Sequence, residues 1–306
     1  MDTALLNTLR SVFGERLQVE VPLAAYTAAR VGGVADALLE AHSVEELADT
    51  VAKLWSLAIP FRVLGGGSNV LISDRGVRDV VVLNRARRLN VHLEEEPPTI
   101  RAESGASLNS LVQRAARAGL SGLEWAAGIP GTLGGAIYGN AGAFGGDMAQ
   151  VVRSVEVLHR QDGRQEWRGE QLAFGYRASL LKRGQSEAVI LAATLQFRRE
   201  AVETIRARLA RFNWKRKQTQ PPGASLGSMF KNPPGDYAGR LIEKSGLKGT
   251  RIGDVEVSPI HANFFINHGQ ARAADIKALM ELVERTVAEK MGVHLEPEVE
   301  LMGEWS

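Results

Sequence analysis

The chain has 306 residues, of which 44% are hydrophobic and 24% charged, so it is a globular protein with room for one large domain or two to three small ones. Its 37 basic and 35 acidic residues leave a net charge of +2, which gives no general case for binding nucleic acid or membranes. The lack of cysteine excludes disulfides, iron–sulfur clusters, thiolate catalysis and cysteine zinc sites.

The first segment predicts an amphipathic helix over residues 2–17, because its apolar residues recur at helical spacing. It lacks the basic start and continuous apolar core of a signal peptide. No apolar run in the sequence approaches the roughly 20 residues that a membrane span needs. We therefore expect a cytoplasmic protein that does not insert into membranes.

A loop is expected over residues 21–33, followed by a helix that Ser43 caps and Pro60 stops. Strands are then expected at 61–64 and 70–72, on either side of the sequence GGGSN (residues 65–69). Taken alone, GGGSN is most often a hairpin turn, although its bare backbone could also cradle an anion. It is not a dinucleotide fingerprint, because no helix opens after it.

The remaining elements are expected in an irregular order. Strands are predicted over residues 79–83, 99–103, 188–197, 261–267 and 295–303, a hairpin over 151–159 and 165–168, and helices from Ser107 to Gly119, from about 201, over 237–245 and over 272–291. A Pro-rich turn is expected from Gln218 to Ala224. Helices and strands mixed in this way indicate an α+β fold and not a doubly wound sheet.

The most unusual stretch runs from Glu124 to Gly146 and contains eight glycines. We call it the glycine run. It bears too few side chains for an ordinary helix or strand, yet its Trp, Ile, Leu, Tyr and Phe residues favour burial, unlike those of a flexible linker. The pattern predicts a buried segment that wraps a flat, phosphorylated ligand.

Three polar residues stand out against apolar neighbours: Arg177, Ser228 and Glu298. Arg177 is more often a structural ion pair, Ser228 a turn hydroxyl and Glu298 part of a solvated face, and from local pattern alone these readings are favoured. The sequence shows no nucleophile–base motif, and its six histidines lack metal-ligand spacing, so no metal site is expected.

Taken together, the motifs resemble the bacterial UDP-N-acetylenolpyruvoylglucosamine reductase family, over about residues 26–303. In chain order, the matching motifs are YTAARVGG, LGGGSN, GLEWAAGIPGTLGGAIYGNAGAFGG, FGYRAS, GSMFKNP, YAGRLIEKSGLKG, HANFFIN and LEPEV. Their order and spacing make the match far more specific than GGGSN alone.

The resemblance implies an FAD-binding domain of two small α+β lobes, like that of vanillyl-alcohol oxidase-type flavoenzymes, and a C-terminal α+β substrate domain. We place the N-terminal helix at residues 1–20, the first lobe at 21–80, the second lobe at 81–200 and the substrate domain at 201–306. A change to an Arg-rich composition near residue 200 supports the last boundary.

The resemblance also assigns residues. It implies that Arg177, Ser228 and Glu298 are catalytic, and that Lys217, Asn232 and Arg177 contact substrate. Residues expected to bind FAD, non-covalently, are Gly65, Gly66, Gly67, Ser68, Asn69, Val70, Gly128, Ile129, Pro130, Gly131, Gly134, Gly135, Ala136, Asn140 and Gly142.

The implied reaction reduces UDP-N-acetylglucosamine enolpyruvate to UDP-N-acetylmuramate for peptidoglycan. Hydride passes from the co-substrate NADPH to N5 of FAD and then to C3 of the enolpyruvyl group, while C2 is protonated. Arg177 would stabilise charge that grows at the carboxylate, Glu298 would share that task, and Ser228 would protonate C2 through a relay of Lys231 or a water.

The chain lacks the extra tyrosine-bearing loop of one branch of the family, whereas KNP (residues 231–233) resembles the branch that has it. Two alternative functions stay open: another FAD-dependent oxidase or dehydrogenase on the same fold, or a non-catalytic nucleotide- or RNA-binding protein that uses the Arg-rich helix. A monomer that binds no nucleic acid is the favoured state.

Overall fold

The computed structural model describes residues 1–305, which form two compact units. The first unit combines residues 1–38, 67–81 and the chain from 217 onward; the second combines 39–66 and 82–216. The boundaries of these two units differ from those of the predicted N-terminal helix, two lobes and substrate domain. The division into those four parts stays a prediction.

All the helices except α4 were expected from capping residues and apolar periodicity. Within residues 1–305 the helices are α1 (Thr3–Phe13), α2 (Val44–Ser56), α3 (Leu108–Arg117), α4 (Leu133–Tyr138), α5 (Val202–Thr219), α6 (Ala238–Lys244) and α7 (Ala273–Met291). The Ser43 and Ser107 hydroxyls accept the Glu46 and Ser110 N–H groups at 3.1 and 3.2 Å, as N-cap side chains do.

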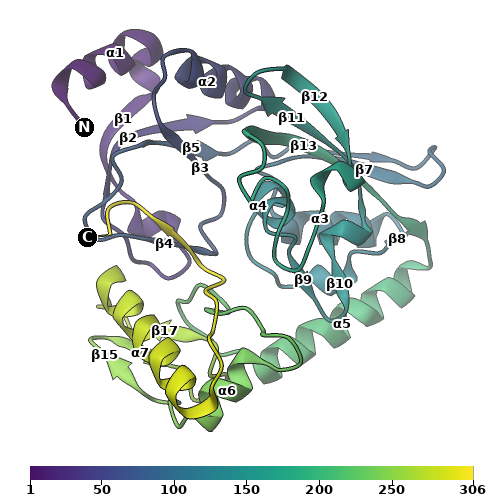
Figure 1. Ribbon diagram of the computed structural model, residues 1–306. Helices are drawn as coiled ribbons and strands as arrows, with labels where there is room; N and C mark the ends of the chain where they lie inside the picture. Colours follow the sequence, from purple (N-terminus) through teal and green to yellow (C-terminus); the bar gives the residue numbers. More distant parts are fainter. Residues whose placement is uncertain (306) are drawn as a thin grey trace. The chain divides into compact units, whose positions relative to one another are not determined.

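A five-stranded antiparallel sheet forms the centre of the second unit, and α4 packs on its strands β13 and β7 (Figure 1). Its strand order is β12 (Gly163–Arg168), β11 (Val152–His159), β13 (Ala188–Gln196), β7 (Thr99–Glu103) and β6 (Leu89–His92). The core of this unit gathers apolar side chains from the sheet, α3, α4 and α5. The predicted hairpin is confirmed, since β11 and β12 pair from Ser154–Arg168 to His159–Gly163.

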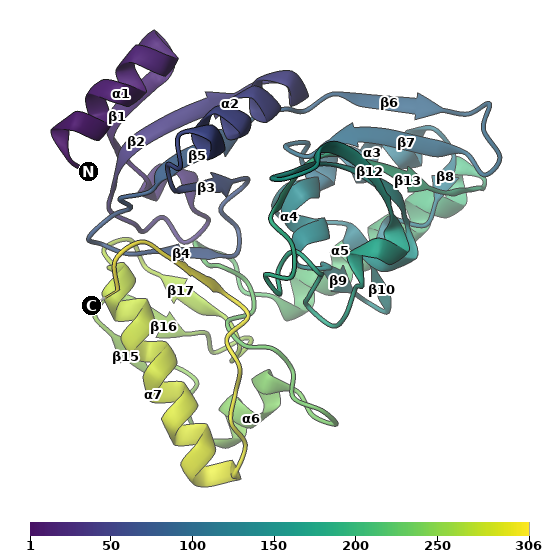
Figure 2. The same ribbon diagram turned by 45° about the horizontal axis from the view of Figure 1, so that its top comes forward.

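The first unit has its own core, in which α7 packs on a three-stranded sheet and on α6 (Figure 2). The sheet has the order β15 (Arg251–Ile252), β16 (Val255–Val257) and β17 (Phe265–Asn267). A separate parallel pair joins β4 (Val70–Ile72) to β18 (Glu300–Met302).

The other strands form a four-stranded sheet and two short pairs. The four-stranded order is β1 (Leu17–Pro22), β2 (Val34–Ala41), β5 (Val80–Asn84) and β3 (Phe61–Leu64), and the pairs are β8 (Leu120–Ser121) with β14 (Arg198–Arg199) and β9 (Gly142–Ala143) with β10 (Gly146–Asp147). The hairpin interpretation of GGGSN is therefore wrong: β3 pairs in this sheet, and β4 pairs with β18.

Four other expectations need correction. The first helix ends at Phe13, and β1 begins within its predicted range. Of the strands expected at 261–267 and 295–303, only β17 and β18 form. The residues that precede β17 and β18 make their main-chain hydrogen bonds to loops and not to a neighbouring strand. Helix α5 continues to Thr219, into the expected Pro-rich turn.

The glycine run does form a helix, α4, contrary to the expectation from its composition. The Thr132 hydroxyl caps the helix by accepting the Gly135 N–H at 3.5 Å, and Leu133, Ala136 and Ile137 are buried. Tertiary burial of these three side chains stabilises a helix that two internal glycines disfavour.

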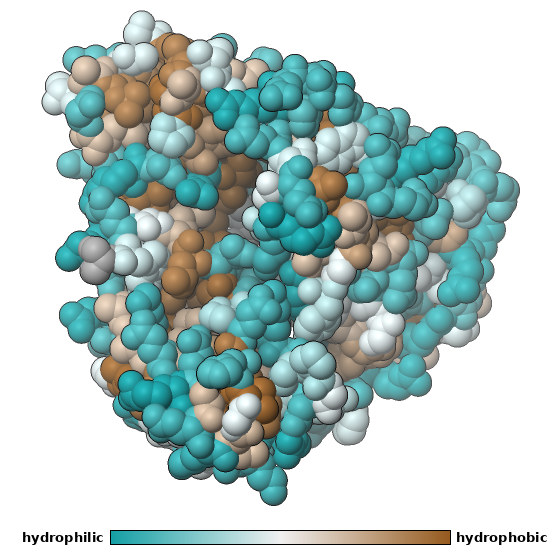
Figure 3. Space-filling view, in the orientation of Figure 1, coloured by the Kyte–Doolittle hydropathy of each residue, from teal (hydrophilic) through white to brown (hydrophobic). Residues whose placement is uncertain are grey.

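The surface in Figure 3 is mostly hydrophilic, with hydrophobic residues scattered over it, including a group over α1. The exposed large hydrophobic residues are single side chains from many elements, such as Trp214 and Tyr237, which are 63% and 69% exposed. Scattered apolar residues of this kind are normal on a globular protein.

Candidate functional site

The first two glycines of GGGSN touch the glycine run within the second unit. A Cβ atom added to Gly65 would lie 2.4 Å from the Thr132 Oγ1 atom, and one added to Gly66 would lie 2.9 Å from the Gly131 Cα atom. Because real Cβ atoms do not approach other atoms this closely, the two backbones meet where no side chain fits. The two glycine-rich segments, to which the resemblance assigned FAD binding, therefore meet here.

The glycine run is ordered by main-chain hydrogen bonds to the segment that precedes α3. The Leu133 and Gly134 N–H groups donate to the Ala106 and Ser104 carbonyls at 2.9 and 2.8 Å, and the Leu108 N–H donates to the Gly131 carbonyl at 3.0 Å. The backbone of the run is therefore fixed before any ligand binds, which reduces the entropic cost of binding one.

Helix α5 packs on the glycine run through Phe212 and Arg216, near its C-terminal end. The Arg216 Nε donates to the Ala127 carbonyl at 2.6 Å, and burial lowers the pKa of this guanidinium. The Phe212 ring stacks on Phe144 with centroids 5.0 Å apart. Because Phe212 and Arg216 are four residues apart, they share one helix face, and this spacing was the available sequence signal.

Arg177 occupies a tight turn, with φ of +54°, that is tied to the glycine run. Its Nη2 donates to the Gly142 carbonyl at 2.9 Å, and the Asn140 Nδ2 donates to the Gly175 carbonyl, also at 2.9 Å. The Ser179 hydroxyl donates to the Tyr138 carbonyl at 2.7 Å. One bond thus holds the Arg177 guanidinium, and two more tie the turn that carries it to the glycine run.

Ser228 and Glu298 lie on adjacent segments of the first unit. The Glu298 N–H donates to the carbonyl of Met229, the residue after Ser228, at 2.8 Å. The Lys231 N–H donates to the Glu296 carbonyl, also at 2.8 Å, and Phe230 bridges to Pro297. The two segments therefore run antiparallel, with Met229 opposite Glu298, although they are far apart in the sequence. Ser228, the residue before Met229, also bridges to Phe264.

Asn263 fixes the segment that carries Ser228. Its Oδ1 accepts the Phe230 N–H at 3.0 Å, and its Nδ2 donates to the Phe230 carbonyl at 2.8 Å. Asn263 is 3% exposed, so this two-point contact lies in the core. Sequence reasoning did not single out Asn263 within the motif HANFFIN, and a polar residue inside an apolar run was the only local signal.

The other predicted site residues differ in exposure and in their hydrogen-bond partners. Lys217 is exposed, and the Asn232 Oδ1 accepts the Ala238 N–H at 3.0 Å, at the start of α6. The Lys231 ammonium pairs with the Glu296 carboxylate. The Asn69 Nδ2 donates to the Glu298 carbonyl at 3.0 Å.

A buried acceptor follows directly after the glycine run. Among the described residues, the Asp147 Oδ1 has no hydrogen-bond partner, while its Oδ2 accepts from Asn140 at 3.5 Å. A buried carboxylate oxygen of this kind is stabilised by a ligand that brings a donor, such as the ribityl hydroxyls of FAD. Together with the glycine contacts, this acceptor makes the segment a good fit for FAD.

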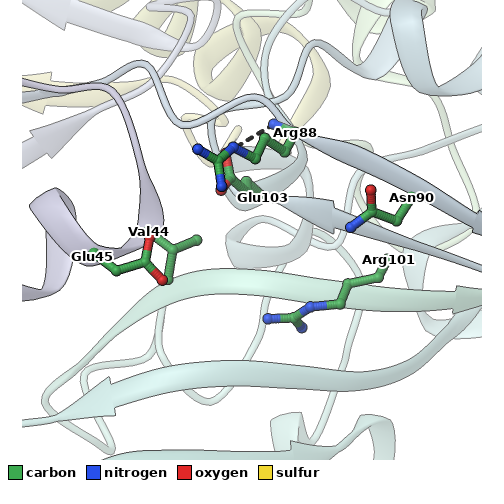
Figure 4. Close-up of a pocket in the computed structure, with 6 residues that line it drawn as sticks. All are labelled: Val44, Glu45, Arg88, Asn90, Arg101 and Glu103. Carbon is green, nitrogen blue, oxygen red and sulfur yellow. Dashed lines mark hydrogen bonds between the residues drawn. The ribbon is translucent and has the colours of Figure 1, made fainter.

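A small pocket lies elsewhere in the second unit, between the start of α2 and strands β6 and β7 (Figure 4). Its lining includes Arg88, Arg101, Glu45 and Glu103, and the Glu103 carboxylate accepts the Arg88 N–H at 2.8 Å. With a cavity volume of about 170 Å³, it is smaller than the roughly 300 Å³ of a typical cofactor pocket. None of the predicted site residues lines it.

No helix within residues 1–305 is long and apolar enough to cross a bilayer. In the same residues, no three His, Asp or Glu side chains are grouped as a metal ion would require.

Comparison with known proteins gives matches along most of the chain. Residues 35–168 match an FAD-binding domain, and residues 218–302 match the C-terminal domain of UDP-N-acetylenolpyruvoylglucosamine reductase. The enzyme of that name from Chloroflexus aggregans is 42% identical over 94% of this chain and 97% of its own length. That from Synechococcus elongatus is 46% identical over 95% of this chain and 96% of its own.

A solved structure agrees with these matches. The crystal structure of the reductase from Thermus caldophilus superposes with a TM-score of 0.80 at 40% identity, covering 94% of this chain and 99% of that one. Relatives this similar over nearly full length share a family. The chain is thus an FAD-containing oxidoreductase that belongs to the UDP-N-acetylenolpyruvoylglucosamine reductase family.

Proposed function

We propose that the chain reduces UDP-N-acetylglucosamine enolpyruvate to UDP-N-acetylmuramate, a step of peptidoglycan synthesis, with NADPH as the reductant. Family membership supports this reaction, and the antiparallel pairing of the segments that carry Ser228 and Glu298 supports the residue roles. The proposal includes a cytoplasmic, monomeric enzyme.

The FAD would be held by the glycine cradle, where Gly65 and Gly66 meet Gly131 and Thr132, with Asp147 as an acceptor. When bound, FAD supplies hydride transfer between NADPH and C3 of the enolpyruvyl group. The cradle's task is to hold the cofactor through the backbone, because side chains are excluded where the two segments meet.

Arg177 would bind the carboxylate of the enolpyruvyl group. Negative charge grows toward C2 and this carboxylate as hydride reaches C3, and a permanently cationic guanidinium stabilises that charge most in the transition state. The bond from Nη2 to the Gly142 carbonyl holds the guanidinium in place, so little reorganisation is needed during the reaction.

Ser228 would deliver the proton to C2, and Glu298 would polarise the carboxylate beside it. A serine hydroxyl is a weak acid and needs a relay that resupplies its proton. The ammonium of Lys231 pairs with Glu296, which supports a water and not Lys231 as that relay.

The direct test is NADPH oxidation by the purified yellow protein under anaerobic conditions. We expect the rate to rise steeply when UDP-N-acetylglucosamine enolpyruvate is added. If the rate were unchanged, the reductase proposal would fail and another flavin oxidase or dehydrogenase activity would take its place. A colourless protein without flavin absorbance would instead support the nucleotide- or RNA-binding alternative.

The role of Ser228 is tested by following the flavin absorbance through both half-reactions. Ser228→Ala should leave flavin reduction by NADPH nearly unchanged and slow reoxidation by substrate by about 10² to 10⁴-fold, the range for loss of a general acid. The reductive half-reaction is the internal control. Similar slowing of both steps would exclude Ser228 as the proton donor.

A further inference from the structure

Asn69, the last residue of GGGSN, hydrogen-bonds to the segment that carries Glu298. Its side-chain Nδ2 donates to the Glu298 carbonyl at 3.0 Å, and the two residues are 229 positions apart in the chain. Its main-chain carbonyl accepts the Glu300 N–H at 2.9 Å. Both residues belong to the first unit, and β4 and β18 continue the pairing just beyond them.

The Glu298 peptide needs these contacts because it lies outside a regular strand. β18 begins only at Glu300, so Glu298 precedes the regular ladder. Its N–H is held by the Met229 carbonyl at 2.8 Å on one side, and its C=O by the Asn69 amide on the other. Two fixed peptide groups set the direction in which the Glu298 side chain leaves the backbone.

We propose that Asn69 is a positioning residue for Glu298, and that it affects the reaction through Glu298 and not by binding FAD. The inference rests on the proposed role of Glu298. The Asn69 side chain acts on the Glu298 carbonyl as a donor: an aspartate in the same place has the same shape but, when ionised, accepts and cannot donate. In this proposal, Asn69, the last residue of GGGSN, orients the Glu298 carboxyl group.

The test compares Asn69→Asp with wild type in both half-reactions of the FAD-loaded protein. Flavin content and flavin reduction by NADPH should stay within about twofold, while reoxidation by UDP-N-acetylglucosamine enolpyruvate should slow by about tenfold, the effect of a modest loss of transition-state stabilisation. Asn90→Asp is the matched control, because Asn90 is exposed on β6, and it should change neither step.

Two further measurements separate positioning from a general structural effect. Hydrogen exchange of peptides spanning residues 295–302 should become faster in Asn69→Asp, since the Glu298 carbonyl loses its Asn69 side-chain donor and the segment is held less firmly. In the Glu298→Gln background, Asn69→Asp should have little additional effect on reoxidation, because the residue through which it acts has already been changed.

Equal slowing of the two half-reactions, or the same fold effect in both backgrounds, would overturn the proposal. Loss of flavin at a normal exchange rate of 295–302 would assign Asn69 to FAD binding instead. If Asn69→Asp did not fold, Asn69→Ala would be taken through the same comparison. A Glu298→Gln enzyme with normal reoxidation would show that the proposed role of Glu298, and not only this inference, is wrong.

Discussion

Close contacts require glycine at some positions of this chain, as turns do at others. Gly65 and Gly66 lie where an added Cβ atom would meet Thr132 and Gly131. At Gly139, within the glycine run, an added Cβ atom would have the Gly135 carbonyl oxygen as its nearest neighbour, at 3.6 Å. Sequence alone showed that glycines were abundant. It could not show which glycines tolerate a side chain, because that depends on which atoms from elsewhere in the chain lie beside each one.

Gly66→Ala should therefore lower both the FAD content and the melting temperature. The added methyl group would lie 2.9 Å from the Gly131 Cα atom, and overpacking of this kind costs about 1–3 kcal/mol. Absorbance of the flavin and thermal unfolding provide the measurements. Gly139→Ala is the control, since its methyl group meets only ordinary contacts; equal behaviour of the two variants would contradict the cradle.

His261 should make stability depend on pH. Burial lowers the pKa of this imidazole from its ordinary 6.5. Below pH 6.5 the unfolded chain then binds more protons than the folded one, so stability falls as the pH drops toward the folded-state pKa and is retained above 6.5.

Urea unfolding of wild type and His261→Gln at a series of pH values between about 5 and 7.5 tests this. The variant should lose less stability on acidification. His42→Gln serves as the comparison, because the His42 side chain is 64% exposed. Parallel curves for wild type and His261→Gln would show that His261 does not contribute.

Helices were well predicted where local signals are strong. Ser43, Ser107 and Gly292 mark the ends of α2, α3 and α7 as expected, because caps act within one turn of the helix. Helix α4 was missed because distant burial, not local propensity, stabilises it. The predicted ranges of β17 and β18 were too long, since the alternation of side chains along a strand does not show where its pairing partner ends.

The start of α7 depends on a residue that is remote in sequence. The two carboxylate oxygens of Asp74 accept the Ala273 and Ala274 N–H groups at 2.9 and 2.8 Å. Asp74→Ala should reduce the free energy of unfolding by about 0.5–2 kcal/mol, the range for loss of a helix cap.

Chemical denaturation followed by circular dichroism measures this loss. Asp49→Ala, at an exposed position of α2, is the matched control and should be close to neutral. No difference between Asp74→Ala and Asp49→Ala would show that the α7 cap contributes little.

For the chain as a single protein, the α+β fold and the reductase family were predicted from motifs and are confirmed. The predicted catalytic and binding residues stay predictions, with Arg177 tied to the glycine run and Ser228 and Glu298 on two paired segments. Binding of FAD to the native state alone should raise its stability by mass action.

Removing FAD should therefore lower the melting temperature, and adding it back should restore it in a concentration-dependent manner. At a free FAD concentration 100 times the dissociation constant, the expected stabilisation is about 2.7 kcal/mol. Differential scanning fluorimetry of apo and reconstituted protein checks this. Identical melting at all FAD concentrations would contradict specific binding.

Composition, capping residues and the ordered motifs were enough to define the class of fold, the family and most helices, because these depend on local chemistry and on motif identity. The partners of Asn69, Asp74 and Arg216 could not be read from the chain, since a main-chain carbonyl or N–H leaves no trace in the sequence. Tertiary structure alone decided that a glycine-rich turn holds Glu298, because that contact exists only when residues 229 positions apart fold together.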